Sequence, residues 1–448
     1  MFVDFLLSQF KILGDDEAII WNDVAYSYGW LLGQVKMWEK EIENIDKGSV
    51  VVIDSDFSPN SIALFLSLIE KSCIIVPIFG GPVELKDSFM EIVRASVLIT
   101  INDNDVFQVK FLDYDSREIS FYKTLREKNH PGIVLFSSGS TGKNKAAVHD
   151  FIPLLEKFKV SRKKFRTIMF LLYDHIGGIN TMLYTLSNGG CLIIAKKRTP
   201  NYVLSLIEKY KAELLPTSPT FINLILLSKE YKNYALDSLK VITYGTEPML
   251  ESTLSVFCSL FPNIKLLQTY GLSEVGILPS KSKNSNSLWL KIGGGGFDIK
   301  IIDNILYVKS QSAMLGYINA PSPFTEDGWF NTEDVVELDG EYMRILGRKS
   351  EIINVGGEKV FPAEVESVIQ EFEGVGSVVI YSEPNAIIGN VVCADVELLD
   401  VIDETMFIRQ LKYYCRTKLQ RYKIPVKINV VKDSQHNERF KKIRKKNV

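Results

Sequence analysis

The residues best suited to chemistry lie in the segment FSSGSTGKNKAAVH, residues 136–149. This segment gathers serine and threonine hydroxyls, two glycines and two lysines directly after an apolar run. A loop of this kind can hold phosphate through backbone N–H groups and hydroxyls. It is not a Walker A loop, because no GK[ST] follows a glycine at the required spacing. Taken alone, the segment is compatible with a phosphate site or with a plain flexible turn.

Three more segments follow in order along the chain: TYGLSE (269–274), GWFNTEDVVELDG (328–340) and GRKSEIINVGGEKVFPAEVE (347–366). Together with the first segment they resemble the motifs of the adenylate-forming superfamily, which includes acyl-CoA synthetases, adenylation domains of peptide synthetases and luciferases. The resemblance covers most of the chain. It implies that a carboxylate attacks the α-phosphorus of ATP, a meeting of two anions that needs cations and dipoles directed at phosphate.

The resemblance also implies which residues contact the nucleotide. Thr141, Gly142 and Lys145 match positions that hold the β- and γ-phosphates, and Glu274 matches an acidic residue near Mg²⁺. Tyr270 matches the aromatic residue that lies against adenine. The full set implied for ATP or AMP and for the thiol acceptor is Ser137, Ser138, Gly139, Ser140, Thr141, Gly142, Lys145, Gly245, Thr246, Glu247, Pro248, Thr269, Tyr270, Gly271, Asp334, Arg348 and Gly357.

Two of these segments depart from the family pattern. Asp334 resembles the aspartate that accepts both ribose hydroxyls, but Glu333 stands where the family has glycine. A side chain and a charge beside the nucleotide would weaken its binding unless the side chain points to solvent. Asn144 replaces a proline in the phosphate segment, whose hydrogen-bond donors are otherwise complete. Gly357 matches a glycine loop that would line the tunnel for a pantetheine thiol.

The catalytic residues implied by the resemblance are Lys442, Glu274 and Thr141. Family members carry the lysine in a P-x-x-x-x-G-K segment, and aligning KKIRK with it puts Lys442 at the catalytic position and Lys441 in place of glycine. An ammonium there would neutralise the carboxylate and the α-phosphate as they meet. Lys441 is the nearest competitor, and a basic, solvated tail is the alternative interpretation.

The segment FLLYDHIGGIN, residues 170–180, resembles the acid pocket of the family. His175 falls where amino-acid-activating members place the aspartate that holds the amino group, which favours an acid without an α-amine. The remaining wall is expected from Phe221, Tyr244, Gly245 and Ile277, with mostly apolar character and a small residue at its base. These residues leave the length and aromaticity of the acid open.

The elements that must position these residues follow an α/β rhythm. Short β-branched runs alternate with amphipathic segments, which predicts parallel strands with helical crossovers in two wound sheets or one large one. Strands are predicted at 49–53, 73–78, 96–100, 132–136, 167–172, 191–195, 239–243 and 264–268. A helix is predicted after the strands at 49–53 and 73–78 and after each strand from 132–136 onward. Closely spaced runs after Ser287 predict an antiparallel segment. We expect a large domain over 1–347, and a small mobile α+β domain over 348–448 with a hinge near Ser350.

Composition narrows the class of protein. With 52 basic and 54 acidic residues in 448, the net charge of −2 gives no chain-wide field for nucleic acid. The five cysteines and four histidines show no metal-finger spacing, which favours buried thiols in a reducing compartment. The apolar stretches are shorter than the roughly 20 residues that span a bilayer. We therefore expect a soluble, cytoplasmic protein.

The main hypothesis is an AMP-forming acid–thiol ligase that uses ATP and Mg²⁺ to activate a fatty or aryl carboxylic acid and passes the acyl group to a pantetheine thiol. Coenzyme A is the first candidate for that thiol. The second hypothesis is an adenylation enzyme that loads an acyl or aminoacyl group onto a carrier protein. The third is a nucleotide-binding relative without turnover, suggested by the irregular residues Asn144, Glu333 and Lys441.

Overall fold

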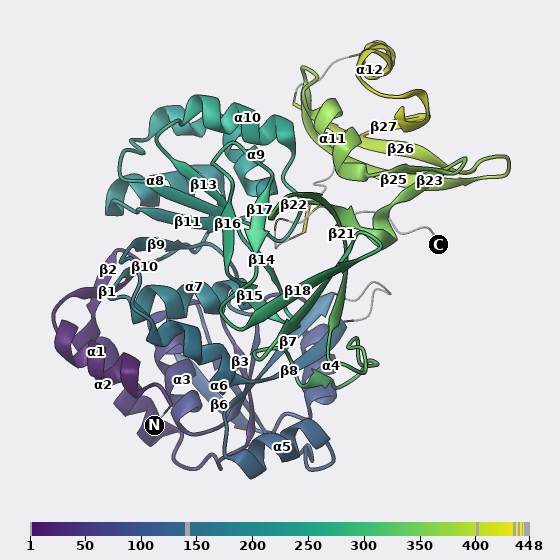
Figure 1. The fold of residues 1–448 in the computed structure, drawn as a ribbon. Coiled ribbons are helices and arrows are strands. Elements are labelled where there is room, and N and C mark those ends of the chain that lie inside the picture. Colours follow the sequence, from purple (N-terminus) through teal and green to yellow (C-terminus); the bar gives the residue numbers. More distant parts are fainter. Residues whose placement is uncertain are drawn as a thin grey trace.

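The computed structural model describes residues 2–138, 144–399, 403–432, 436, 437, 440 and 442. Two seven-stranded sheets and a six-stranded antiparallel sheet form a large unit, and a smaller α+β unit sits on it near the C-terminus (Figure 1). The α/β class with mainly parallel sheets, an antiparallel segment and a small α+β unit is confirmed. The boundary at residue 347 and the hinge at Ser350 stay predictions.

The first sheet has the strand order β20-β8-β7-β4-β3-β5-β6. Its centre is parallel, because buried β-branched runs such as Val50–Asp54 face helices on both sides. Strands β6, β8 and β20 pair antiparallel at the edges. The bounds are β3 (Val50–Asp54), β4 (Ile74–Ile78), β5 (Val97–Ile101), β6 (Phe107–Phe111), β7 (Gly132–Ser138), β8 (Asn144–Asp150) and β20 (Gly316–Tyr317).

The second sheet has the order β13-β12-β11-β9-β10-β1-β2 and is parallel except at β2. The carboxyl ends of β11, β12 and β13 lie next to one another, in register. The bounds are β1 (Glu17–Trp21), β2 (Val24–Ser27), β9 (Arg166–Met169), β10 (Cys191–Ile194), β11 (Leu214–Thr217), β12 (Val241–Tyr244) and β13 (Lys265–Gln268).

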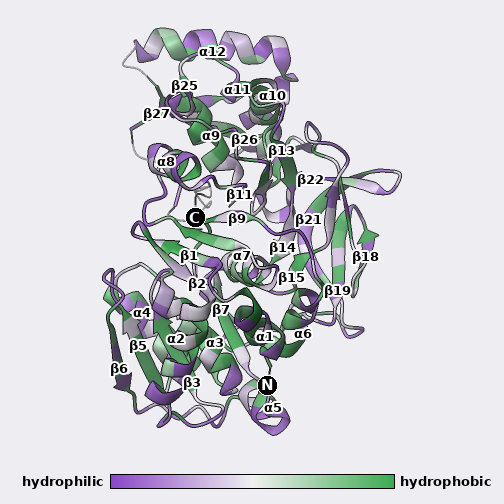
Figure 2. Cartoon of the chain, turned by 90° about the vertical axis from the view of Figure 1, so that its left-hand side faces the viewer, coloured by the Kyte–Doolittle hydropathy of each residue, from purple (hydrophilic) through white to green (hydrophobic). Residues whose placement is uncertain are grey.

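The helices form layers around these two sheets. The largest apolar core lies between the sheets and includes α1, α2, α3 and α7, whereas α4 and α5 cover the first sheet and α8, α9 and α10 the second. Hydrophobic colour is accordingly concentrated inside the cartoon of Figure 2. The bounds are α1 (Asp4–Leu13), α2 (Tyr28–Glu41), α3 (Pro59–Glu70), α4 (Val83–Val93), α5 (Ser120–Lys128), α6 (Phe151–Leu155), α7 (Ile176–Ser187), α8 (Pro200–Tyr210), α9 (Pro219–Ser228) and α10 (Glu251–Leu260).

The antiparallel segment forms a sheet of order β16-β17-β22-β21-β19-β18, joined to the second sheet through the hairpin β14-β15. It begins near Ser280, slightly before the predicted change at Ser287. The bounds are β14 (Tyr270–Leu272), β15 (Gly276–Leu278), β16 (Ser280–Ser282), β17 (Leu290–Ile292), β18 (Phe297–Ile302), β19 (Ile305–Ser310), β21 (Phe330–Asp339) and β22 (Tyr342–Arg348).

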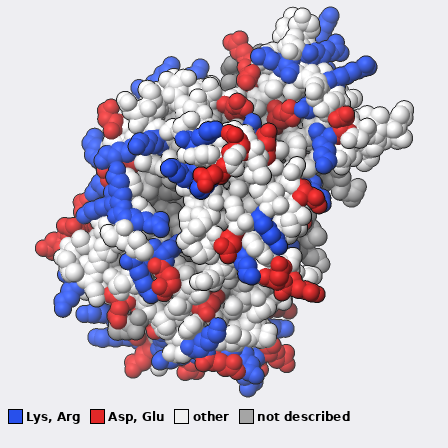
Figure 3. Space-filling model, viewed as in Figure 1, with Lys and Arg blue, Asp and Glu red and all other residues white. Residues whose placement is uncertain are grey.

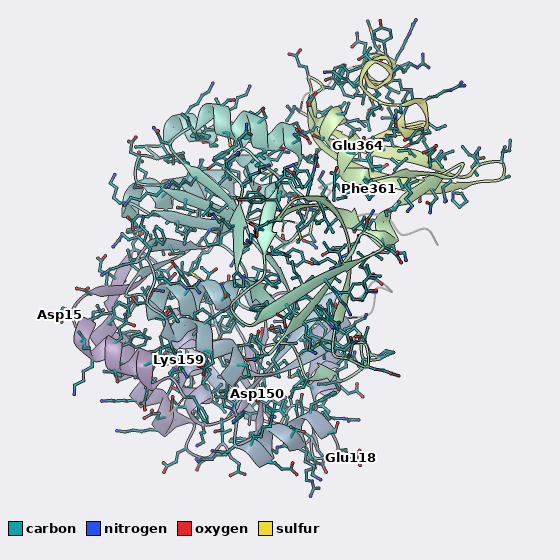
Figure 4. All side chains as sticks on the ribbon, viewed as in Figure 1. Asp15, Glu118, Asp150, Lys159, Phe361 and Glu364 are labelled. Atoms are coloured by element: carbon teal, nitrogen blue, oxygen red, sulfur yellow. The ribbon has the colours of Figure 1, made fainter. Side chains whose placement is uncertain are left out.

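The small unit has its own apolar core between a five-stranded sheet and two helices. Its helix α11 begins directly after Phe361 and includes Glu364, and both residues are labelled in Figure 4. This helix contacts α10 of the large unit. The side chain of Ser367 accepts from the Ser252 N–H across this boundary at 3.2 Å. The bounds are β23 (Ile353–Val355), β24 (Glu358–Val360), α11 (Pro362–Gln370), β25 (Val375–Asn385), β26 (Gly389–Leu398), α12 (Glu404–Lys418) and β27 (Lys427–Val431).

Three details of the predicted rhythm are wrong. The strand at 132–136 is followed by the antiparallel strand β8 rather than a helix. Residues 144–150 of β8 pair with residues 132–138 of β7. The strand at 264–268 is followed by β14, and the strand predicted at 167–172 ends at Met169.

The remaining features of the fold are the distribution of charged side chains and the length of its apolar helices. Positive and negative side chains are interspersed over the face shown in Figure 3, in line with the small net charge of the chain. Among the described residues, no helix has both the length and the apolar character to span a membrane.

Candidate active site

A cavity of about 390 Å³ opens where the two large sheets, the antiparallel sheet and the C-terminal tail meet. The carboxyl ends of β11, β12 and β13 form one wall, as expected for ligand sites in wound parallel sheets. The first turn of α7 forms a second wall, and Asp334 of β21 with Arg348 of β22 forms a third. Lys442 reaches the same cavity from the tail. Segments distant in sequence therefore converge on one site.

A buried aspartate, a tyrosine and an arginine form the first cluster in this cavity. The Tyr270 hydroxyl donates to Asp334 Oδ2 at 2.6 Å, and Arg348 Nε lies 3.7 Å from Asp334 Oδ1. Burial raises the pKa of Asp334, and hydrogen bonding from Tyr270 and the charge of Arg348 partly offset that rise. Burial and then Asp334 raise the pKa of Tyr270, so its phenol stays protonated and can donate. The cluster is a preformed acceptor for hydroxyl groups.

A second cluster surrounds Glu274. Its Oε1 accepts from the Ser137 hydroxyl at 3.3 Å and from the Tyr317 hydroxyl at 2.6 Å. The Lys145 ammonium lies 5.2 Å from the centre of the Tyr317 ring, a cation–π contact. A carboxylate oxygen held by two hydroxyls suits a hard cation, and the nearby ammonium of Lys145 suits a phosphate group.

His149 ties this second cluster to the sheet. It is fully buried, and burial lowers the pKa of its imidazole, which is therefore neutral. Its Nε2–H donates to the Ser273 carbonyl at 2.6 Å, because a carbonyl oxygen can only accept. The hydrogen bond fixes the residue before Glu274 against β8. His149 is thus a structural residue.

Lys442 is held by one carboxylate from each unit. Its backbone N–H donates to Glu247 Oε2 at 3.3 Å, and its ammonium lies 2.9 Å from Glu366 Oε2 on α11. The Lys442 side chain is 12% exposed and that of Glu366 only 1%. Glu247 is itself fixed by the Thr220 N–H at 2.8 Å. The arrangement brings a cation to the edge of the cavity.

Comparison with known protein families identifies the architecture. The model of the AMP-binding enzyme family matches residues 14–304, which is more than half of the chain. The chain belongs to the AMP-binding enzyme family. The model of the AMP-binding enzyme C-terminal domain matches residues 364–441, within the small unit and the tail.

Individual relatives are distant. The chain is 27% identical over 319 residues to a 2-succinylbenzoate–CoA ligase of Listeria monocytogenes, covering 66% of this chain and 65% of that protein. It is 27% identical over 321 residues to the long-chain-fatty-acid–CoA ligase FadD13 of Mycobacterium tuberculosis, covering 66% and 63%. The matched part thus spans just under two thirds of these relatives. The crystal structure of the anthranilate CoA ligase AuaEII with anthranoyl-AMP has the same fold, with a TM-score of 0.81 at 19% identity over 96% of this chain and 93% of that one.

Most residues that the family resemblance singled out line this one cavity of the AMP-binding enzyme. They are Ser137, His175, Gly245, Thr246, Glu247, Pro248, Thr269, Tyr270, Gly271, Glu274, Ile277, Asp334, Arg348 and Lys442. Gly139, Ser140, Thr141 and Gly142 lie outside the described residues, as do the side chain of Ser138 and the competitor Lys441. Gly357 lies on the exposed turn between β23 and β24, outside the cavity lining.

Two predicted pocket residues, Phe221 and Tyr244, do not line the cavity and belong to the core beside α9. Side chains alternate along a strand, so Thr243 and Gly245 face the cavity while Tyr244 between them points to the opposite side. Phe221 packs on Phe170 with ring centroids 4.3 Å apart. Both expectations for these residues are wrong.

The expected apolar wall is also wrong. Asn180, Thr181, Thr217 and Thr243 line the cavity and make the wall largely polar. Gly245 lines the cavity, and an added Cβ there would lie 2.8 Å from the Thr269 carbonyl oxygen. His175 caps α7, since its Nδ1 accepts from the Gly177 N–H at 3.1 Å. Its position is therefore set by the helix.

The departure at Glu333 has a structural explanation. Glu333 has φ of +60°, a conformation in which glycine is less strained, and its side chain is exposed. Its N–H donates to Asn331 Oδ1 at 2.9 Å, which stabilises the turn. The extra carboxylate thus points to solvent, and the backbone keeps the shape that presents Asp334.

Sequence reasoning missed Tyr317. It comes from the two-residue strand β20, which pairs with β8 far from it in sequence. The sequence carries little sign of this pairing; in the structure, an added Cβ at the preceding Gly316 would lie 2.4 Å from the Phe121 ring.

Proposed function

We propose that this AMP-binding enzyme is an ATP-dependent acid–thiol ligase. A carboxylate oxygen of the acid attacks the α-phosphorus of ATP, and the bond to pyrophosphate breaks to leave an acyl-adenylate. The sulfur of a pantetheine thiol then attacks the acyl carbon, AMP leaves, and the thiol loses its proton. The observation that carries the proposal is the convergence of Asp334, Glu274 and Lys442 on one cavity in a chain of this family.

The residues present fit a nucleoside phosphate. The two oxygens of the Asp334 carboxyl group can accept the two ribose hydroxyls, and Arg348 beside it supplies a positive charge. Gln268 lies beside Tyr270 and has a buried side-chain oxygen without a hydrogen-bond donor among the described residues. That oxygen matches the need of an exocyclic amine on a base. Thr246, with φ of +75°, follows Gly245 along the same wall.

Glu274 is the residue we assign to Mg²⁺. Proteins bind this ion through one or two carboxylates together with substrate phosphates, so a single carboxylate near the phosphate segment suffices. Within the described part of the chain, no group of three or more acidic, histidine or cysteine side chains forms a separate metal site. When bound, the ion would neutralise phosphate charge. Tyr317 and Ser137 hold the carboxylate in place for it.

Lys442 is the residue we assign to transition-state charge. An ammonium at the cavity edge stabilises the negative charge that develops as the carboxylate and α-phosphate meet. In the structure the Lys442 ammonium lies 2.9 Å from Glu366 Oε2. In the reaction it leaves this carboxylate and contacts the reacting groups instead. Removal of a donor in this role typically costs about 10²- to 10³-fold in rate.

The cavity favours a compact acid that carries polar groups. About 390 Å³ is near the lower end of the roughly 300–1,000 Å³ found for small-molecule sites, and nucleotide and acid must share it. Asn180, Thr217 and Thr243 offer hydrogen-bonding groups along the wall. These features support a small aryl or substituted acid over a long unsubstituted fatty acid. Coenzyme A is the proposed acceptor, with Gly357 near the thiol path after rearrangement.

The test is acid-dependent pyrophosphate release with ATP and Mg²⁺ across aryl, hydroxy, fatty and amino acids. Release with small polar acids, lost in Lys442→Ala and retained in the exposed control Lys432→Ala, is the expected result. Acyl transfer to coenzyme A and to holo-carrier proteins is then compared to identify the acceptor. Nucleotide binding without pyrophosphate release for any acid would refute the ligase and leave a binding protein without turnover.

A further inference from the structure

An aromatic residue of the C-terminal tail is seated on the large unit, two positions before Lys442. The ring of Phe440 lies 5.3 Å from the rings of both Phe170 and Phe221, measured between centroids. The imidazole of His436 also stacks on Phe440, with ring centroids 5.2 Å apart. Phe170 and Phe221 are 2% and 0% exposed, and together they form what we call the aromatic patch.

The backbone conformation of Phe440 is not one that its own residue type favours. Its φ is +53°, in the left-handed region that non-glycine residues seldom adopt. A conformation of this kind persists only when its surroundings hold it. The surroundings here are the aromatic patch, the His436 ring and a bridge between His436 and Lys442. The ring contacts therefore help to hold Phe440 in this conformation.

The same stretch of tail carries both hydrogen bonds that fix Lys442. The Lys442 N–H reaches Glu247 of the large unit, and its ammonium reaches Glu366 of the small unit. The backbone contact of 3.3 Å is long, so it is a weak anchor by itself. Phe440, two residues earlier, adds an apolar contact between this stretch and the large unit.

We propose that Phe440 is a positioning residue that latches the tail onto the aromatic patch and so holds Lys442 at the cavity for acyl-adenylate formation. The proposal rests on the proposed function, because it assigns the latch to the first of the two steps. Phe440 does not touch the reacting groups. Its effect is on the fraction of molecules in which Lys442 is in place.

The test uses the full chain with Phe440→Ala and Phe440→Gly, beside Phe440→Tyr, which keeps a ring. Glycine suits the φ of +53° but lacks the ring, so equal losses in both variants assign the effect to the ring. Phe111→Ala is the matched control, because Phe111 is 61% exposed on β6. The Phe170–Phe221 contact remains in every variant, so the large unit should keep its fold.

Two measurements are made on each protein. Hydrogen exchange of the peptide that contains residues 436–442 should become about tenfold or more faster in Phe440→Ala and Phe440→Gly, and stay near wild type in the others. The kcat for pyrophosphate release should fall by about tenfold with little change in the KM for ATP. Thioester formation from added acyl-adenylate should be retained.

The outcomes separate the latch from the function. Unchanged tail exchange and unchanged pyrophosphate release in Phe440→Ala would overturn the latch, as would equal losses in both half-reactions. If the wild-type protein releases no pyrophosphate with any acid, the proposed function fails. The hydrogen-exchange measurement still tests the latch in that case, because it does not depend on catalysis.

Discussion

Replacement of Asp334 by asparagine should move nucleotide binding and stability in opposite directions. The Asp334 carboxylate accepts from the Tyr270 hydroxyl at 2.6 Å and lies 3.7 Å from Arg348 Nε, and it is almost fully buried. Asparagine has nearly the same shape but no charge. The substitution therefore tests what the charge does, with little change in packing.

The loss in binding follows from hydrogen bonds to a charged group. Such a bond contributes about 1.5–3 kcal/mol, and the neutral amide cannot accept two ribose hydroxyls as strongly as the carboxylate. A loss of this size corresponds to about a 10- to 150-fold rise in the dissociation constant for ATP. The KM for ATP should rise accordingly, with a smaller change in the KM for the acid.

The effect on stability has the opposite sign. Burial raises the pKa of Asp334, so between its unfolded and folded pKa values the folded protein binds more protons than the unfolded chain. Stability therefore falls as pH rises through that window, because the charged form of this buried carboxyl group is a cost to folding. Asp334→Asn removes this cost, and the variant should be at least as stable as the wild type at pH 7.

Calorimetric titration with ATP and urea unfolding at pH 7 measure the two effects on the same preparations. Glu333→Gln is the matched control, because it removes an exposed charge from the adjacent position. ATP affinity within twofold of wild type would contradict the ribose assignment. A variant that loses both affinity and several kcal/mol of stability would show that Asp334 supports the fold rather than the ligand.

Three further perturbations test the site and the fold. Tyr317→Phe removes the 2.6 Å hydrogen bond to Glu274 and should raise the Mg²⁺ concentration for half-maximal pyrophosphate release by about tenfold, measured by Mg²⁺ titration. Because burial lowers the pKa of His149, wild-type stability should fall as pH drops below the ordinary histidine value of about 6.5, and urea midpoints of His149→Gln should depend less on pH. Burial lowers the pKa of Lys157 to about 8, so Lys157→Met should raise the unfolding midpoint at pH 7, and this gain should shrink between pH 8 and the unfolded value of about 10.5.

The sequence was most informative where local pattern and tertiary structure agree. Parallel strands covered on both faces are continuous β-branched runs, and β3, β4 and β5 were found for that reason. Motif residues that follow such strands then meet at one edge of the sheet, which is how Gly245 and Tyr270 reach the same cavity. Convergence of the main site residues was therefore predictable.

Other features depend on pairing between distant segments and leave little local trace. Strand β1 joins β10 across more than 160 residues, and no period in the first 48 residues indicates that partner. Tyr317 reaches Glu274 only because β20 pairs with β8. The motif that contains Tyr244 predicts a place in the pocket. Side chains alternate along strand β12, however, and the Tyr244 ring therefore packs in the core.

The two proposed steps need different arrangements of the same chain. While Lys442 lies at the cavity, Gly357 is on an exposed turn outside it, so the thiol path assigned to Gly357 does not meet the acyl group. We therefore expect the small unit to turn between the steps. That turn must break polar contacts of 3.2–3.4 Å at Ser252, Asn223 and Glu247, each of which is replaced by water at small cost.

The contact of Phe440 with the aromatic patch differs from these polar contacts, because water cannot replace it. It therefore contributes more than they do to the preference for the first arrangement. Its removal should shift molecules toward the second. This explains why Phe440→Ala is expected to slow adenylate formation and to spare thioester formation, whereas damage to the shared cavity would slow both.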